Sequence, residues 1–346
     1  MKQTLALEKM FQQTTGSNRI YEAVLLVENT KGDVSACFGY GGKHADSPLT
    51  MASTAKLFTT VCILQLWEQG RLSLEDKVAR HVDEAVLKGL HVYKGREYSF
   101  ELTVADLLFQ TSGLPDYFEE GSNMRKRTLT EDYSITFAQM VEETKKLRPH
   151  FAPQPASSKA YYSDINFDLM GHVIEQIEGL PLEKVYEKRI FGPLGLARTY
   201  LPTGPEHTVP EIYYKDQRLH RPQAISSYRA SGGCITTAVE LMVFLKGFFN
   251  GALFPVRLLE KLAVYRRLQL SMGPIRYGGG FMQIPLRSAN TLFMGKGELL
   301  GHSGTTGSFA FYYPLKDLFM VGDLNQLAHP SYAIRLVMKL AMGYKA

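Results

Sequence analysis

A serine and a lysine lie three residues apart in the stretch LTMASTAKLFTTVCILQLWEQG, at residues 49–70. Residues at i and i+3 share one face of an α-helix, so Ser53 and Lys56 can touch. The residues after them are apolar on nearly every side, which predicts one helix through the middle of the protein, with Lys56 at least partly desolvated. A desolvated amine that loses its proton near neutral pH can accept one from a hydroxyl. Ser53 would then be a nucleophile, and the unpaired N–H groups at the helix start would suit a developing oxyanion.

The same two residues also have an ordinary structural interpretation. Ser53 would be the N-cap of the helix, and Lys56 would extend from its first turn into solvent. Many unrelated helices contain a serine and a lysine at this spacing. The stretch alone therefore does not establish catalysis.

Strand patterns occur near both ends of the chain, with helical patterns between them. YEAVLLVENTKGDVSACFGYG predicts a hairpin that turns at 29–33, and strand-like runs return in RYGGGFMQI, GSFAFYYP and DLFMVGDLN. HPSYAIRLVMKLAMGYK predicts a closing amphipathic helix, and LTVADLLFQ, SITFAQMVEETKKL, DINFDLMGHVIEQIEG and PLEKVYEKRIF predict helices in the middle. We therefore expect a discontinuous sheet domain of residues 1–70 and 225–346, and a mostly helical domain of residues 71–224 inserted into it.

The composition is that of a folded, soluble protein. Its 346 residues are 45% hydrophobic and 21% charged, enough apolar material for one large or two closely packed domains. The net charge of +5 is spread along the chain, and the densest basic run, at 125–127, closely follows two glutamates. A solvated loop explains that run better than a nucleic-acid site does.

Targeting signals, metal-binding motifs and cofactor-binding motifs do not stand out. The N-terminus lacks the pattern of a signal peptide, and no apolar run reaches the ~20 residues that a bilayer crossing needs. Cys37, Cys62 and Cys234 form no CxxC pair, which favours a reducing compartment. The histidines are scattered, and the glycines at 278–280 precede no predicted helix. We expect a cytoplasmic protein without a metal, a cofactor, a membrane anchor or a nucleic-acid partner.

Three further stretches follow MASTAK in a fixed order: QTSGLPDY at 110–117, YSDINFDLMGHVIE at 162–175 and GHSGTTGSF at 301–309. Together with SGGCITTAVELMVFL at 231–245, they resemble the serine β-lactamase and penicillin-binding-protein superfamily. The likeness is to its class C-like branch of β-lactamases, D-Ala-D-Ala carboxypeptidases, D-aminopeptidases and family VIII-type esterases. It implies an α+β fold of the β-lactamase/transpeptidase type: an antiparallel sheet flanked by helices, an inserted mostly helical domain, and an active site between the two.

The resemblance also implies roles for individual residues. Ser53 matches the nucleophile, and Lys56 and Tyr162 match the residues that exchange its proton with the leaving group. The backbone N–H groups of Ser53 and Thr305 would form the oxyanion hole. The opposite wall of the cleft would be His302, Ser303 and Gly304. Either Lys56 or Tyr162 could be the general base, because a phenol can act as one only if a neighbouring ammonium holds it ionised.

The chain departs from the family pattern at two positions. Asp164 stands where asparagine is usual, and a carboxylate there should pair with Lys56 and favour the charged amine. We therefore expect Tyr162 to take a larger share of the proton transfer, or Asp164 to face a cationic group on the substrate. His302 stands where true β-lactamases commonly have lysine. A mostly uncharged histidine is a weaker anchor for a substrate carboxylate, which argues against efficient β-lactam turnover.

These residues predict a serine hydrolase that forms an acyl-enzyme with a small ester, amide or D-peptide. The expected type is a carboxylesterase or D-amino acid peptidase with weak or no β-lactamase activity, in which Tyr117 and Phe118 line the substrate pocket. One alternative is a catalytically impaired relative that only binds or regulates. Another is a true β-lactamase or D-Ala-D-Ala carboxypeptidase. An α/β-hydrolase is excluded because GHSGTTG lacks the Gly-x-Ser-x-Gly spacing.

Overall fold

An antiparallel sheet of eight strands is the centre of the fold. The computed structural model describes residues 2–17, 19–121, 124–153, 159–204, 206–287, 291–292 and 294–344. The strand order is β2-β1-β14-β13-β12-β11-β10-β9, and each neighbouring pair is antiparallel. The strands are β1 (Ala23–Glu28), β2 (Ser35–Tyr40), β9 (Arg266–Arg267), β10 (Arg276–Tyr277), β11 (Met282–Pro285), β12 (Glu298–Ser303), β13 (Ser308–Tyr313) and β14 (Leu318–Asp323).

The two ends of the chain meet in this sheet. The predicted hairpin of β1 and β2 is confirmed, and β1 also pairs with β14, with Val24 opposite Asp323. The first five residues of β1, Ala-Val-Leu-Leu-Val, are all buried, as in strands that are covered on both faces. The sheet therefore needs a layer of helices on each side.

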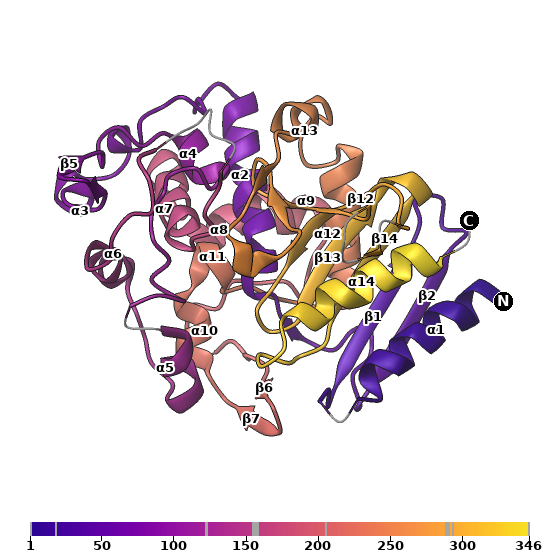
Figure 1. The fold of residues 1–346 in the computed structure, drawn as a ribbon. Helices are drawn as coiled ribbons and strands as arrows, with labels where there is room; N and C mark the ends of the chain where they lie inside the picture. The colour runs from indigo at the N-terminus through magenta and orange to yellow at the C-terminus, as the bar shows by residue number, and fades with distance from the viewer. Residues whose placement is uncertain are drawn as a thin grey trace.

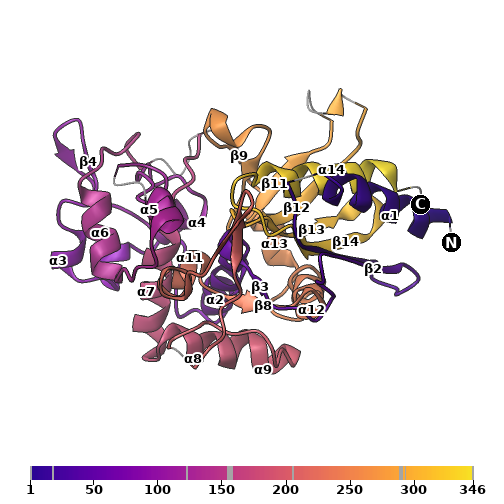
Figure 2. The same ribbon diagram turned by 90° about the horizontal axis from the view of Figure 1, so that it is seen from below.

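Helices from both termini cover one face of the sheet. Helices α1 (Lys2–Thr15) and α14 (Ser331–Gly343) pack against each other on that face, and α12 (Ala238–Asn250) packs against β1, β13 and β14 on the other (Figure 2). The predicted closing helix is confirmed as α14. In the part of the chain that the structure describes, no helix combines the length and apolarity needed to span a bilayer.

The segments between the two halves of the sheet are mostly helical. Those between residues 84 and 178 lie at the end of the sheet away from the chain termini (Figure 1). Their longest helix is α7 (Ile165–Glu178), and the division into a sheet domain and an inserted helical domain stays a prediction. The remaining helices are α2 (Lys56–Glu68), α3 (Glu84–Leu87), α4 (Val104–Leu108), α5 (Met124–Thr130), α6 (Phe137–Lys145), α8 (Leu182–Tyr186), α9 (Gly192–Leu194), α10 (Pro222–Ser227), α11 (Arg229–Gly232) and α13 (Arg257–Leu262). Three small ladders complete the structure: β3 (Leu49–Thr50) with β8 (Ile235–Thr236), β4 (Val92–Tyr93) with β5 (Arg96–Glu97), and β6 (Ile212–Tyr214) with β7 (Gln217–Leu219).

The prediction of one helix over 49–70 is wrong at its beginning. Strand β3 occupies 49–50, a 3₁₀ turn follows at Ala52–Ala55, and the α-helix begins only at Lys56. The break has a physical cause, because β3 pairs with β8 and Ala52 has a φ of 43°, a left-handed conformation that a helix cannot contain. Gly304 packs against this bend, since a Cβ there would lie 2.6 Å from the Met51 carbonyl oxygen. Ser53 is thus held on a constrained turn directly before α2.

Helix α2 is buried along almost its whole length, as its sequence predicts. Phe58 anchors it through edge-on ring contacts to Phe244 of α12 at 4.5 Å, to Phe191 at 5.3 Å and to Tyr186 of α8 at 5.8 Å between centroids. One side chain therefore connects the helix after Ser53 to elements on both sides of it.

We expect Phe58→Ala to lower the free energy of unfolding by about 3–5 kcal/mol, because the surrounding rings cannot close the cavity that it leaves. Denaturant unfolding followed by circular dichroism measures this loss. The control is Val243→Ala, in the helix α12 that Phe58 contacts. Val243 is 41% exposed, and we expect its substitution to change the free energy of unfolding by less than about 0.5 kcal/mol. Equal effects of the two substitutions would contradict the anchoring role of Phe58.

Candidate active site

The Lys56 ammonium joins three segments of the chain. Its side chain has no exposed surface, and Nζ donates to Ser53 Oγ at 3.2 Å, to Asp164 Oδ1 at 2.7 Å and to the Ser231 carbonyl at 2.6 Å. A carboxylate and a carbonyl only accept hydrogen bonds, so this arrangement uses all three N–H donors of a charged amine. The alternative in which Lys56 extends into solvent is wrong. The pairing with Asp164 that the sequence predicts is present.

Tyr162 lies beside this group as a buried, neutral phenol. The Lys56 Nζ is 5.2 Å from the centre of its ring. Burial and then the charge of Asp164 raise the pKa of Tyr162 well above its usual range, against a smaller opposing effect of the Ser53 hydroxyl. Among the described residues, its hydroxyl has no hydrogen-bond partner of normal geometry. The phenol is therefore suited to donate a proton rather than to accept one at the start of a reaction.

Gln110 fixes the segment that carries Tyr162 and Asp164. Its Oε1 accepts from the Ser163 N–H at 3.0 Å, and its Nε2 donates to the Ser163 carbonyl at 3.3 Å. The Ser163 hydroxyl donates to the Pro115 carbonyl at 2.7 Å. The QTSGLPDY stretch thus holds the YSD stretch by its backbone, which explains in physical terms why the two stretches belong to one site.

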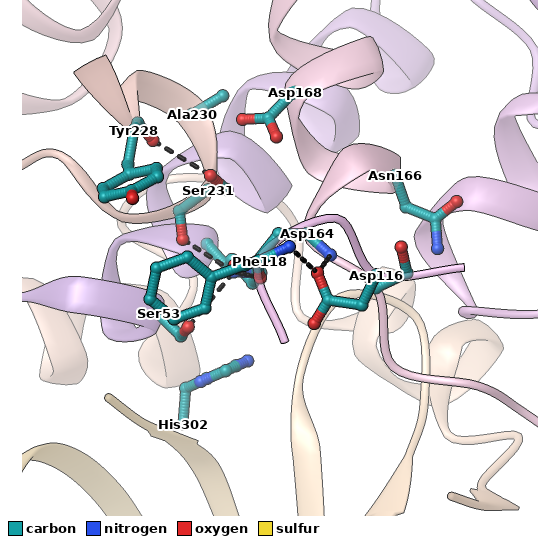
Figure 3. A network of polar contacts seen from close by, with 12 residues as sticks. Ser53, Asp116, Phe118, Asp164, Asn166, Asp168, Tyr228, Ala230, Ser231 and His302 are labelled. Carbon is teal, nitrogen blue, oxygen red and sulfur yellow. Dashed lines mark hydrogen bonds and ion pairs between the residues drawn. The ribbon is translucent and has the colours of Figure 1, made fainter. Parts of the chain in front are cut away.

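Two further carboxyl groups surround Asp164 (Figure 3). Asp116 Oδ1 accepts from the backbone N–H groups of Phe118 at 3.1 Å and of Asp164 at 3.4 Å. Burial, followed by the charge of Asp164, raises the pKa of Asp116 well above its usual range and that of Asp168 to about 7. Asp116 therefore favours its protonated form and Asp168 is only partly ionised near neutral pH, whereas Asp164 is the carboxyl group that forms the ion pair with Lys56.

His302 is buried behind the site and uncharged. Burial and then the charge of Lys56 lower the pKa of its imidazole to about 3. Its Nδ1 lies 2.9 Å from the Ser303 carbonyl, which can only accept, so Nδ1 carries the hydrogen. The unprotonated Nε2 then accepts from the Tyr277 hydroxyl at 3.3 Å. A ring with both nitrogens engaged in this way has no charge and no free donor to offer a substrate carboxylate.

A small pocket of about 50 Å³ opens beside Ser53. Its lining combines polar groups, among them those of Ser53, Asp164 and Thr305, with apolar side chains. The apolar side chains are those of Phe118, Ile212, Ile225, Tyr228 and Leu327. Phe118 and Tyr228 meet edge to face at 5.2 Å between ring centres. Both polar and apolar groups are therefore available to a small ligand beside Ser53.

The other residues predicted to bind substrate lie outside the lining of this pocket. Tyr117 is fully buried, and its hydroxyl donates to Asp168 Oδ2 at 3.0 Å. Ser303 is half-buried on β12 and Gly304 packs against the turn before Ser53. Their roles in substrate binding, and that of Thr305 in an oxyanion hole, stay predictions.

The Ser231 carbonyl and the Tyr228 ring belong to the site but were not predicted from the sequence. SGGCITTAVELMVFL begins at Ser231, so the motif was recognised, but a backbone carbonyl leaves no signal in the residue type. Tyr228 reaches the pocket only through the packing of α10 and α11. Among the residues that the structure describes, no three His, Cys, Asp or Glu side chains are grouped so that they could hold a metal ion.

Comparisons with known proteins bear on the fold and the family of the chain. A solved D-stereospecific amidohydrolase from Streptomyces sp. is 25% identical, with a TM-score of 0.80 and 99% of each chain covered. The D-amino acid amidase of Ochrobactrum anthropi SV3, solved with L-phenylalanine amide, has a TM-score of 0.80 at 18% identity, with 99% of this chain and 98% of that chain covered, and shows the same fold.

A curated relative, Protein flp of Staphylococcus aureus (strain NCTC 8325 / PS 47), is 32% identical over 186 residues, which are 51% of this chain. The matched part is about a third of the length of that relative, 34%. The model of the Beta-lactamase family matches residues 7–337, nearly the whole chain. The α+β fold and the resemblance to β-lactamases and penicillin-binding proteins are thereby confirmed. The chain belongs to the Beta-lactamase family, a family of serine hydrolases.

Proposed function

We propose that this protein is a serine hydrolase in which Ser53 attacks the carbonyl carbon of a small ester or amide and forms an acyl-enzyme. The observation that carries the proposal is the contact of the Ser53 hydroxyl with the buried Lys56 ammonium, which is itself paired with Asp164. A serine is a weak nucleophile unless a neighbouring base takes its proton. The buried pair supplies such a base one helical turn away.

The proton of Ser53 has a short path away from the nucleophile. Lys56 passes one proton to Asp164 across their 2.7 Å hydrogen bond and becomes a neutral amine. That amine accepts the hydroxyl proton of Ser53 as the oxygen bonds to the substrate carbon. Lys56 is then the general base in contact with Ser53, and Asp164 stores the proton that Lys56 releases.

Tyr162 supplies the proton that the leaving group needs. Its neutral phenol donates a proton to the departing alcohol or amine and regains one from the Lys56–Asp164 pair. The proton that left Ser53 thus ends, in net terms, on the leaving group. The backbone N–H groups of Ser53 and Thr305 hold the negative oxygen of the tetrahedral intermediate. A water molecule then hydrolyses the acyl-enzyme through the same relay.

The charges around the pocket favour a substrate with a free amino group near the scissile bond. Asp164 borders the pocket, while the buried and neutral His302 offers no counter-charge to a carboxylate. A positive substrate group would also allow Asp116, which accepts from the Asp164 backbone N–H, to ionise, which further balances its charge. Esters and amides of small amino acids fit these charges better than β-lactams, whose binding depends on a carboxylate. The D-stereospecific amidohydrolase of similar fold supports this substrate class.

We expect a fluorophosphonate to add one label to the wild-type protein, at Ser53, and none to Ser53→Ala. Intact-mass measurement followed by peptide mapping detects the adduct. Thr54→Ala, one residue along the same turn, is the control and should keep the label. A wild-type protein that takes up no label would instead favour the alternative of a relative that only binds.

We expect Asp164→Asn to slow hydrolysis of a D-alanine p-nitroanilide by about tenfold more than that of its N-acetylated form, which corresponds to about 1.4 kcal/mol of lost ammonium recognition. Both substrates should slow in absolute terms, because the relay partner of Lys56 is lost. The ratio of kcat/KM for the two substrates is the measurement. An unchanged ratio would show that Asp164 does not face the amino group.

A further inference from the structure

A second cavity is larger than the pocket beside Ser53. It measures about 910 Å³ and lies between α6, α7, α10 and α11. Helix α11 separates the two spaces, since Ala230 borders the large cavity and Ser231 borders the small pocket. Figure 3 shows Asp168 and Ala230 together, beyond Ser231 as seen from Ser53. The wall is thin because α7 and α11 touch at Gly171, where a Cβ would come within 2.5 Å of the Ala230 Cβ.

The wall of this cavity is connected directly to the catalytic residues. The carbonyls of two consecutive residues in α11 point toward α2: that of Ala230 accepts from Thr59 at 2.8 Å and that of Ser231 accepts from Lys56 at 2.6 Å. A ligand that displaces α11 would therefore alter a hydrogen bond of Lys56. The residue that lines the cavity, Ala230, thus directly precedes the residue that binds Lys56, Ser231.

The charges of the cavity favour a cationic ligand. Arg229 is already balanced by Glu175 at 3.0 Å and Glu183 at 2.8 Å. Burial lowers the pKa of His172, so its ring adds no positive charge. Asp168 borders the cavity and is 94% buried, at 6% exposure, with Tyr117 donating to one of its carboxylate oxygens. Two glutamates against one arginine leave an excess of negative charge, and Asp168, with its pKa of about 7, adds to it when it ionises.

An aromatic surface lies near the same acids. The rings of Phe137 and His172 are stacked at 4.7 Å between centres with an angle of 12°. Ile135, Met140 and Leu182 add apolar surface to the lining. Apolar walls with a few convergent polar groups are typical of sites that bind small organic molecules.

We propose that this cavity is a second ligand site, which binds a small organic amine with an apolar ring. Binding of the amine there would displace α11 and thereby change the rate of hydrolysis at Ser53. The ammonium would lie against Asp168 and Glu175, and the ring against Phe137. This site is separate from the catalytic pocket, so the proposal does not depend on the substrate of Ser53.

N,N-dimethylbenzylamine is the probe, because a tertiary amine cannot capture the acyl group as a stable amide. We expect calorimetry to show binding to the wild type, binding about tenfold weaker to Asp168→Asn, and binding no more than about twofold weaker than the wild type to Asp164→Asn, which removes a charge that opposes ionisation of Asp168. Benzyl methyl ether, the neutral analogue, should bind at least about tenfold more weakly than the amine. The opposite pattern, loss in Asp164→Asn with retention in Asp168→Asn, would place the amine in the catalytic pocket and overturn the proposal, as would no binding at all.

Phe137→Ala keeps the test decisive if Asp168→Asn does not fold, since Phe137 is only partly buried. We expect about fivefold weaker amine binding to this variant, and unchanged binding would overturn the proposed position of the ring. Turnover of a p-nitrophenyl ester tests the coupling. The amine should change kcat by at least about twofold at saturating substrate, and a purely competitive effect would contradict a separate, coupled site.

Discussion

A buried ammonium is the constraint on which the rest of this structure depends. A charged amine without exposed surface costs several kcal/mol unless opposite charge and hydrogen bonds compensate for it. Lys56 obtains this compensation from Asp164, from the Ser231 carbonyl and from the Ser53 hydroxyl. These partners come from three separate segments, so the fold must bring α2, α7 and α11 to one point. The absence of a side chain at Gly171 allows α7 and α11 to approach closely enough.

The same constraint explains why aspartate at position 164 is compatible with catalysis. In the described surroundings, Asp116 and Asp168 are pushed toward their neutral forms by burial and by the charge of Asp164. His302 is also neutral. The centre thus contains one ammonium paired with one carboxylate, beside a protonated Asp116 and a partly ionised Asp168. These charges are the basis of the proposal that the substrate carries an amino group.

The sequence predicted the features that depend on patterns of side chains. The alternation of strands and helices showed that both chain ends build the sheet, and the apolar surroundings of Lys56 showed that it is buried beside Ser53. It did not predict that residues 49–55 leave the helix, because β3 pairs there with β8, which lies far away in the sequence, and Ala52 has a positive φ.

Other features of the site lie in groups that sequence patterns do not encode. The Ser231 carbonyl binds Lys56 through the backbone, so the residue type carries no signal of it. Tyr117 lies in the motif that supports the site, but its hydroxyl bonds to Asp168 and it is absent from the lining of the pocket beside Ser53. The large cavity behind α11 is formed by segments far apart in the chain, and only their packing reveals it.

A double-mutant cycle on Lys56 and Asp164 tests the central claim most directly, with the rate of fluorophosphonate capture at Ser53 as the readout. If the two residues act as one unit, Lys56→Met and Asp164→Asn should each slow capture by about 10²-fold or more, and the double variant should be no slower than the slower single variant. If the two effects multiply, Lys56 and Asp164 act independently, and the buried pair is not what activates Ser53.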